Sequence, residues 1–209
     1  ILHISLAINN FNWTICHQIS SLVGTNIWVV ISGDRTGRLL KYDPRSKEVT
    51  VLLEGLAFGN GVAISKDSTF LLIVETTTQR ILRFWLQGSK AGALEVFTQL
   101  SGYPDNIKRN PRGEFWVATT IGSDILKNSS RSHSHKRKTV LTSIRKSNTL
   151  KPASINDVIG MRFNENGEIM EVLNDKFEKI MTRLSEVEEN NGSLWLGSVV
   201  APDVGIYKL

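Results

Sequence analysis

Short apolar and polar runs separated by turn sequences predict β-strands through most of the chain. Between Gly37 and Leu53 an alternating run, a DPRS turn and a β-branched run predict a hairpin. The next segment predicts four consecutive strands, at Val62 to Ile64, Phe70 to Val74, Ile81 to Trp85 and Leu94 to Phe97. Four strands within about 40 residues match one blade of a β-propeller.

The same pattern then recurs along the chain. NGVAISKDSTFLLIV from Asn60 is echoed by DNIKRNPRGEFWVAT from Asp105, and 46 residues separate Asn60 from Asn106. That separation is near the period of about 40 to 50 residues of propeller blades. A hairpin around Asn166-Gly167 and a strand in SLWLGS add further blade elements. A β-sandwich with accidental spacing is the alternative to a propeller.

Two regions fall outside this order. Residues 1 to about 30 show no usable turn-and-strand rhythm, so 1–32 is set apart from the partial propeller at 33–209. Residues 122–153 are polar, basic and Ser-rich, which predicts a mobile insertion between blades. The chain begins without Met, and we expect a truncation at the N-terminus.

The composition and charge indicate a globular domain and argue against several other classes of protein. The 209 residues are 41% hydrophobic and 22% charged, as in one globular domain, and the net charge of +5 is concentrated near residues 131–151. SHKRK within it favours a solvated loop, because no nucleic-acid recognition motif accompanies it, and a nuclear-localisation or nucleic-acid patch is the alternative. No apolar run reaches the roughly 18 residues of a membrane span. The single Cys16 excludes an intrachain disulfide.

Asn60, Asp105 and Asn106 lie at equivalent starts of strands in two successive blades. In a propeller such positions converge on the central channel. Carboxylate and amide oxygens suit a hard cation such as calcium. The alternative is that these residues hydrogen-bond their own backbone in turns.

Acidic residues cluster before the last strands, in LSEVEENNGSLWLG. Strand alternation places Glu186 and Glu188 on one face and Glu189 on the other. A carboxylate that faces a channel acts as a general acid or base if burial raises its pKa, whereas a solvated acidic turn is the alternative. No nucleophile elbow, phosphate-binding loop or HExxH motif is present, and His133 and His135 have no orienting partner nearby in sequence.

The runs GDRTGRLLKYDPRSKEVTVLLEG, NGVAISKDSTFLLIV, GYPDNIKRNPRGEFWVAT and VEENNGSLWLGSVVAPDVGIYKL closely resemble the strictosidine synthase-like family, over about residues 33–120 and 160–209. The resemblance implies an all-β, six-bladed propeller, of which this chain would hold about three to four blades. Calcium-dependent lactonase and paraoxonase propellers are more distant relatives. The resemblance favours the propeller over the sandwich.

Site roles follow from the same resemblance. Asn60, Asp105 and Asn106 are similar to calcium ligands of the paraoxonase site, and Glu189 resembles the general-base Glu of strictosidine synthase. The family carries Pro where this chain has Gly59. The implied function is amine–aldehyde condensation in alkaloid-type metabolism, or hydrolysis, of a small-molecule substrate. The alternative is an inactive propeller remnant or a binding module.

The resemblance also implies a vacuolar or endoplasmic-reticulum location, although the opening residues show no signal-peptide pattern. Three Asn-x-Ser/Thr sequons occur, at Asn12, Asn128 and Asn191. Entry into the secretory pathway would make Asn12 and Asn191 glycosylation sites.

Overall fold

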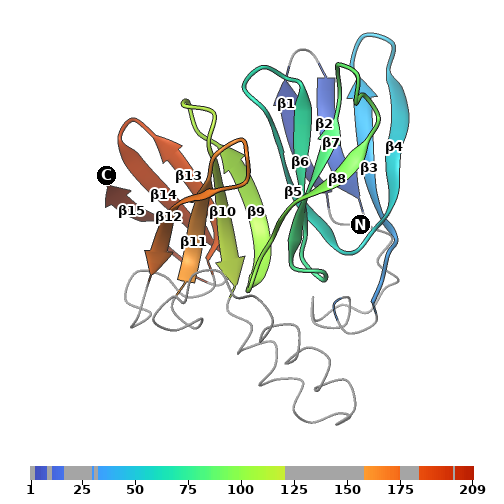
Figure 1. Cartoon of the computed structure of the whole chain (residues 1–209). Coiled ribbons are helices and arrows are strands. Elements are labelled where there is room, and N and C mark those ends of the chain that lie inside the picture. Colours follow the sequence, from blue (N-terminus) through green and yellow to red (C-terminus); the bar gives the residue numbers. More distant parts are fainter. Residues whose placement is uncertain are drawn as a thin grey trace.

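The protein is built from four antiparallel β-sheets, seen in a computed structural model that describes residues 3–8, 11–16, 30, 33–120, 158–174, 184–199 and 201–209 (Figure 1). The first sheet contains β1 (His3–Ile8), β2 (Phe11–Cys16), β3 (Gly37–Asp43) and β4 (Glu48–Leu56). The second contains β5 (Gly59–Ile64), β6 (Phe70–Glu75), β7 (Arg80–Trp85) and β8 (Leu94–Gln99). The third contains β9 (Tyr103–Arg109), β10 (Phe115–Thr120), β11 (Val158–Phe163) and β12 (Ile169–Asn174). The fourth contains β13 (Leu184–Asn190), β14 (Ser193–Ser198) and β15 (Gly205–Lys208).

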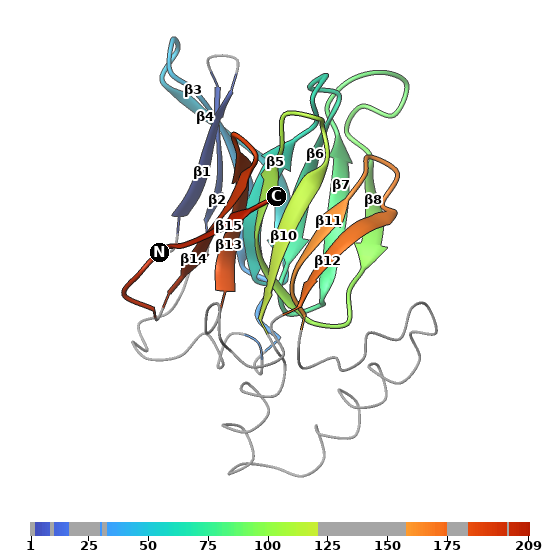
Figure 2. The same ribbon diagram turned by 90° about the vertical axis from the view of Figure 1, so that its left-hand side faces the viewer.

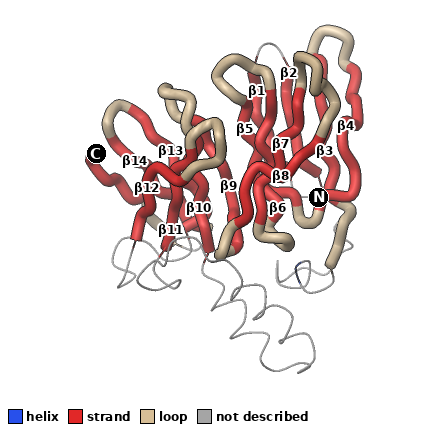
Figure 3. Tube along the Cα trace, viewed as in Figure 1, coloured by secondary structure: helices blue, strands red, loops and turns tan. Residues whose placement is uncertain are grey.

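Each sheet is a meander in which neighbours in sequence are hydrogen-bonded neighbours in space. The first strands of successive sheets meet, because β5 contacts both β1 and β9, and β9 contacts β13. The first two sheets lie on the right of Figure 1 and the last two on the left, and tight turns join most of the strands (Figure 3). This is the blade arrangement of a propeller, and each sheet is called a blade below.

Apolar layers fill the spaces between blades. In β6, Phe70 and Leu72 pack toward the third blade, whereas Leu71 and Ile73 pack toward the first. Successive side chains of a strand point to opposite faces, so a blade enclosed on both sides needs a continuous apolar run such as FLLIV. The FWVA run of β10 divides in the same way between the second and fourth blades.

The N-terminal segment departs from the sequence-based expectation. Residues 3–8 and 11–16 form β1 and β2, and β2 pairs with β3, so the first blade joins strands from both sides of residue 33. The expectation that residues 1 to 30 contain no strand rhythm is therefore wrong. Each run is only six residues long, and pairing with β3 supplies the order that local sequence does not reveal. The predicted insertion at 122–153 lies outside the described residues.

The predicted hairpins are confirmed. β3 pairs with β4, β11 pairs with β12, and the four strands predicted for residues 62–97 form the second blade. None of the described segments forms a helix long and apolar enough to cross a bilayer. The fold class predicted from the sequence is thus correct, and the described blades number four.

Candidate functional site at the inner strands

Two equivalent β-bulges lie on neighbouring inner strands. In β5, the pairs Gly59 with Glu75 and Val62 with Ile73 leave Asn60-Gly61 opposite a single residue of β6. In β9, Asp105-Asn106 lie in the same way opposite one residue of β10. A bulge bends the strand and re-aims side chains, and bulges are common beside active sites. The sequence repeat between Asn60 and Asn106 thus corresponds to a repeated backbone irregularity.

Glycine at position 61 allows the two bulges to approach closely. A Cβ on Gly61 would lie 2.5 Å from the backbone nitrogen of Ile107 and 2.8 Å from the Cα of Asn106. Real Cβ atoms do not approach backbone so closely, so the second and third blades meet here only because residue 61 has no side chain. This close contact brings the two bulges side by side.

A hydrogen-bond chain joins the bulges. Asn60 is 6% exposed, and its Nδ2 donates to Asp105 Oδ1 at 2.8 Å and to Thr76 Oγ1 at 3.3 Å. The Thr76 hydroxyl donates its single proton to the Pro104 carbonyl at 2.7 Å, so its oxygen acts as acceptor toward Asn60. The amide of Asn60 is therefore oriented with its nitrogen toward Asp105. The convergence of Asn60 and Asp105 that the sequence predicted is present.

The carboxyl of Asp105 is poised to exchange a proton near neutral pH. Burial raises its pKa to about 6, and the nearby charge of Glu186 acts in the same direction, while the hydrogen bond from Asn60 opposes both. Burial also raises the pKa of Glu186, although Lys108 partly offsets this effect. The Lys108 Nζ lies 3.1 Å from Glu186 Oε1. We call Asn60, Asp105, Lys108 and Glu186 the inner-strand centre.

The inner-strand centre has the donor chemistry of a hard-cation site. Asp105 carries a buried carboxylate, and Asn60 and Asn106 carry amide groups on the same two bulges. The Asn60 amide points its nitrogen toward Asp105, so it would have to turn its oxygen inward to bind the same ion. Within the described ranges, no group of three or more His, Cys, Asp or Glu side chains is placed to hold a metal ion. The residues present thus fit part of a calcium shell, which usually has six to eight oxygens.

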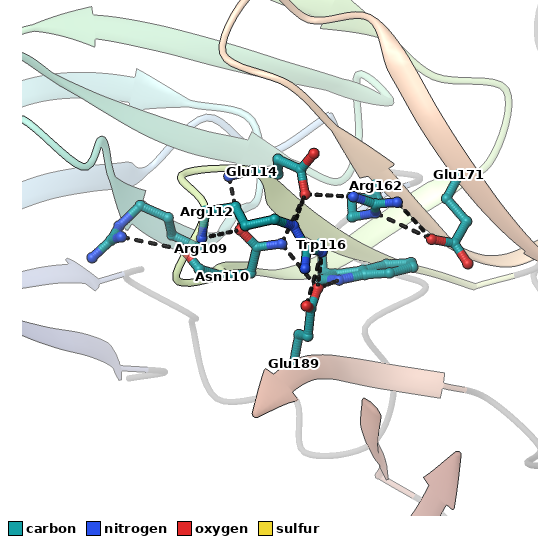
Figure 4. Close-up of polar contacts among 8 residues, drawn as sticks. All are labelled: Arg109, Asn110, Arg112, Glu114, Trp116, Arg162, Glu171 and Glu189. Carbon is teal, nitrogen blue, oxygen red and sulfur yellow. Dashed lines mark hydrogen bonds and ion pairs between the residues drawn. The ribbon is translucent and has the colours of Figure 1, made fainter. Parts of the chain in front are cut away.

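Glu189 lies near the other end of β13 from Glu186. Two residues lie between them, which corresponds to about 10 Å along a strand. Figure 4 shows the polar contacts around Glu189. The Glu189 carboxylate is 6% exposed and accepts hydrogen bonds from Asn110 at 2.9 Å, from Arg112 at 2.9 Å and from the Trp116 indole at 2.8 Å. These donors belong to β10 and to the turn before it, so Glu189 joins the fourth blade to the third.

The network around Glu189 favours ionised carboxylates. Burial opposes ionisation of Glu189, but hydrogen bonds from Trp116 and Asn110 and the nearby arginine charges lower its pKa. Burial likewise opposes ionisation of Glu114, yet hydrogen bonds from Asn110, Arg112 and Arg162 lower its pKa to about 2. A carboxylate with a lowered pKa is a weak general base. The general-base role expected for Glu189 stays a prediction. The structure shows the hydrogen bonds by which Glu189 joins the third and fourth blades.

Sequence reasoning did not select Glu186 as the acidic partner of Asp105. Glu186 could have been selected from its position in a bulge of β13, directly after Ser185. The bulge is visible only in the strand pairing, not in the sequence. Of the predicted glycosylation sites, Asn191 lies exposed on the tight β13–β14 turn, with a φ of 49°, and Asn12 lies in β2. Asn128, His133 and His135 lie outside the described residues.

The four sheets form a partial β-propeller (Figure 2). The contacts of Asn60, Asp105, Lys108 and Glu186 place a polar site at its inner strands. Residues 23–89 match the family profile described as strictosidine synthase. Strictosidine synthase-like protein 10 of Arabidopsis thaliana is 47% identical over 183 residues, which cover 86% of this chain and 49% of the relative. Strictosidine synthase-like protein 3 of the same plant is 36% identical over 184 residues, covering 87% and 47%. The chain belongs to the strictosidine synthase-like family, and it spans about half the length of these relatives.

Solved structures agree on the fold. A gluconolactonase from Xanthomonas campestris superposes with a TM-score of 0.61 at 11% identity, covering 97% of this chain and 55% of that one. A luciferin-regenerating enzyme gives a TM-score of 0.58 at 14% identity, covering 90% and 50%. At such low identity the likeness concerns the fold alone. It supports the propeller over the sandwich.

Proposed function

We propose that the chain contributes an acid–base centre for chemistry on a small organic molecule, with Asp105 as the general base. The observation that carries this proposal is the pKa of Asp105, which burial raises to about 6. A base is most effective when its pKa lies near the working pH, because it is then ionised yet still able to take a proton. The hydrogen bond from Asn60 orients the carboxylate.

Hydrolysis of an ester or lactone is the reaction we favour. Asp105 would take a proton from the water as its oxygen attacks the carbonyl carbon, and would return that proton to the leaving alkoxide oxygen as the acyl C–O bond breaks. The hydrogen bond from Asn60 would hold the Asp105 carboxylate in place. A calcium ion held by Asp105, Asn60 and Asn106 would supply positive charge to polarise the substrate carbonyl, but it would also lower the pKa of Asp105. The general-base role of Asp105 therefore belongs to the calcium-free centre. The name of the gluconolactonase neighbour suggests sugar lactones as the first substrates to test.

Condensation of an amine with an aldehyde is the second candidate. Asp105 and Glu186 place two carboxyl groups near each other, and Lys108 forms an ion pair with Glu186. A protonated amine would be attracted to this excess of negative charge and would lose its proton to Asp105 before it attacks the aldehyde. Membership of the strictosidine synthase-like family makes tryptamine and secologanin the pair to test. A non-catalytic binding module remains the alternative to both reactions.

The proposal is tested by assaying lactone hydrolysis with and without added calcium, and tryptamine–secologanin condensation, on the wild type and on Asp105→Asn. We expect Asp105→Asn to lower kcat at least about 100-fold, the scale of general-base catalysis. In the absence of calcium, the wild-type kcat/KM should rise with pH through about 6 and then level off, since the ionised form of Asp105 is the base. Glu48 is exposed on the outer strand β4, so Glu48→Gln is the control and should leave activity unchanged. A folded wild type with neither activity would refute the enzyme proposal.

A further inference from the structure

A third bulge occurs in β13, the inner strand of the fourth blade. Leu184 pairs with Ser198 and Glu186 pairs with Gly197, so one extra residue, Ser185, is inserted at this point. The bulge has the same position in its blade as the two described above. In each case a buried aliphatic residue follows it directly: Val62, Ile107 and Val187.

This register makes Ser185 the structural equivalent of Asn60 and Asp105. Each is the first residue of its bulge, and β9 lies between β5 and β13. Asn60 and Asp105 are in direct contact, and Glu186, the next residue after Ser185, forms an ion pair at 3.1 Å with Lys108 of β9, the strand that carries Asp105. The third bulge thus borders the same centre as the first two.

The three equivalent positions differ in chemistry. They carry an amide in the second blade, a carboxylate in the third and a hydroxyl in the fourth. Ser185 is 7% exposed, and its hydroxyl donates a hydrogen bond to the Gly197 carbonyl at 3.3 Å, across its own bulge. A neutral hydroxyl binds a hard cation more weakly than a carboxylate does, because charge count largely sets calcium affinity.

We propose that Ser185 is the third ligand-facing position of the inner-strand centre, and that its hydroxyl keeps the affinity of this centre for a divalent cation low. The inference rests on the proposed function for one point only, the location of the centre at Asp105. With Asp at position 185, carboxylates at two of the three equivalent bulge positions, 105 and 185, would face one cation, whereas the Glu186 carboxylate is paired with Lys108. Serine leaves that part of the site uncharged and available to a polar substrate group.

The test is calorimetric titration of the whole chain with calcium chloride. Ser185→Asp should bind calcium at least roughly tenfold more tightly than the wild type, in line with the effect of ligand charge on calcium sites. Ser193→Asp is the matched control, because this substitution adds the same charge to the same blade, but at the start of β14. Ser193→Asp should bind calcium as the wild type does. Equal affinities for the two variants would overturn the inference.

Two further variants keep the test decisive. Ser185→Asn introduces the amide found at Asn60 without a buried charge, so it should give a smaller gain in affinity if Ser185→Asp does not fold. In the double variant Asp105→Asn/Ser185→Asp the gain should vanish, and a gain that persisted would show that position 185 does not share a centre with Asp105. The calorimetric titration measures calcium binding independently of any enzyme activity. Tight binding by Ser185→Asp alongside an inactive wild type would therefore uphold this inference while refuting the proposed enzyme.

Discussion

Replacing Glu189 with alanine should lower the free energy of unfolding by about 2 kcal/mol. The substitution leaves the Trp116 indole N–H, the Asn110 amide and the Arg112 guanidinium without their shared acceptor. Trp116 and Asn110 are buried, and an unsatisfied buried donor costs about 1 to 3 kcal/mol, whereas the Arg112 side chain is 54% exposed and can be solvated. Urea denaturation at pH 7, followed by tryptophan fluorescence, measures the loss.

Glu188→Ala is the matched control for that experiment. Glu188 lies next to Glu189 in the same strand but is exposed, so its loss should change stability by less than about 0.5 kcal/mol. Glu189→Gln keeps one acceptor oxygen and should fall between the two. If Glu189→Ala unfolds at the same urea concentration as Glu188→Ala, the network does not hold the third and fourth blades together. A loss of activity in Glu189→Gln would count for the general-base prediction only if the variant remained folded.

Replacing Gly61 with alanine should destabilise the chain by about 3 kcal/mol, the upper range for inserting atoms into a packed site. The added Cβ would lie 2.5 Å from the Ile107 nitrogen and meet backbone atoms, which cannot rotate away as a side chain can. The second and third blades would have to separate, and the Asn60–Asp105 hydrogen bond would lengthen. Thermal unfolding monitored by circular dichroism measures the change.

The control for Gly61 separates a steric clash from the usual effect of losing a glycine. Gly88 has a positive φ of 79°, and nothing lies within 4 Å of its added Cβ. Gly88→Ala should therefore cost only about 1 kcal/mol of backbone strain. If Gly61→Ala destabilises the chain no more than Gly88→Ala does, the bulges of β5 and β9 are not in the close contact described.

The sequence predicted the fold best where strand order is local. Residues 60–97 contain continuous apolar runs bounded by turn residues. A blade pairs each such run with its neighbour in sequence, so the local pattern is sufficient to predict these strands and their order. β1 and β2 were missed because six-residue runs carry little local signal. Their identity as strands depends on pairing with β3, whose first residue, Gly37, lies 21 positions after the end of β2 at Cys16.

The site was predictable only in part for a related reason. Repetition of the sequence motif placed Asn60 and Asp105 at equivalent strand starts, and equivalent starts of adjacent blades meet. The role of Glu186 depends on a bulge in β13, and strict alternation cannot reveal an inserted residue. The contacts of Glu189 depend on side chains some 75 residues away in sequence, such as Trp116 at a separation of 73. No local pattern encodes them.

The central claim is that Asp105 is a buried, proton-exchanging carboxyl at the meeting point of the inner strands. A carbon-13 NMR titration of the side-chain carboxyls tests it directly, with Asp105 assigned by the signal missing from Asp105→Asn. The structure predicts that this signal titrates with a pKa of about 6, because burial and the charge of Glu186 disfavour ionisation. A pKa close to 3.8, the usual value for an aspartate, would contradict the account, since Asp105 would then be a solvated side chain.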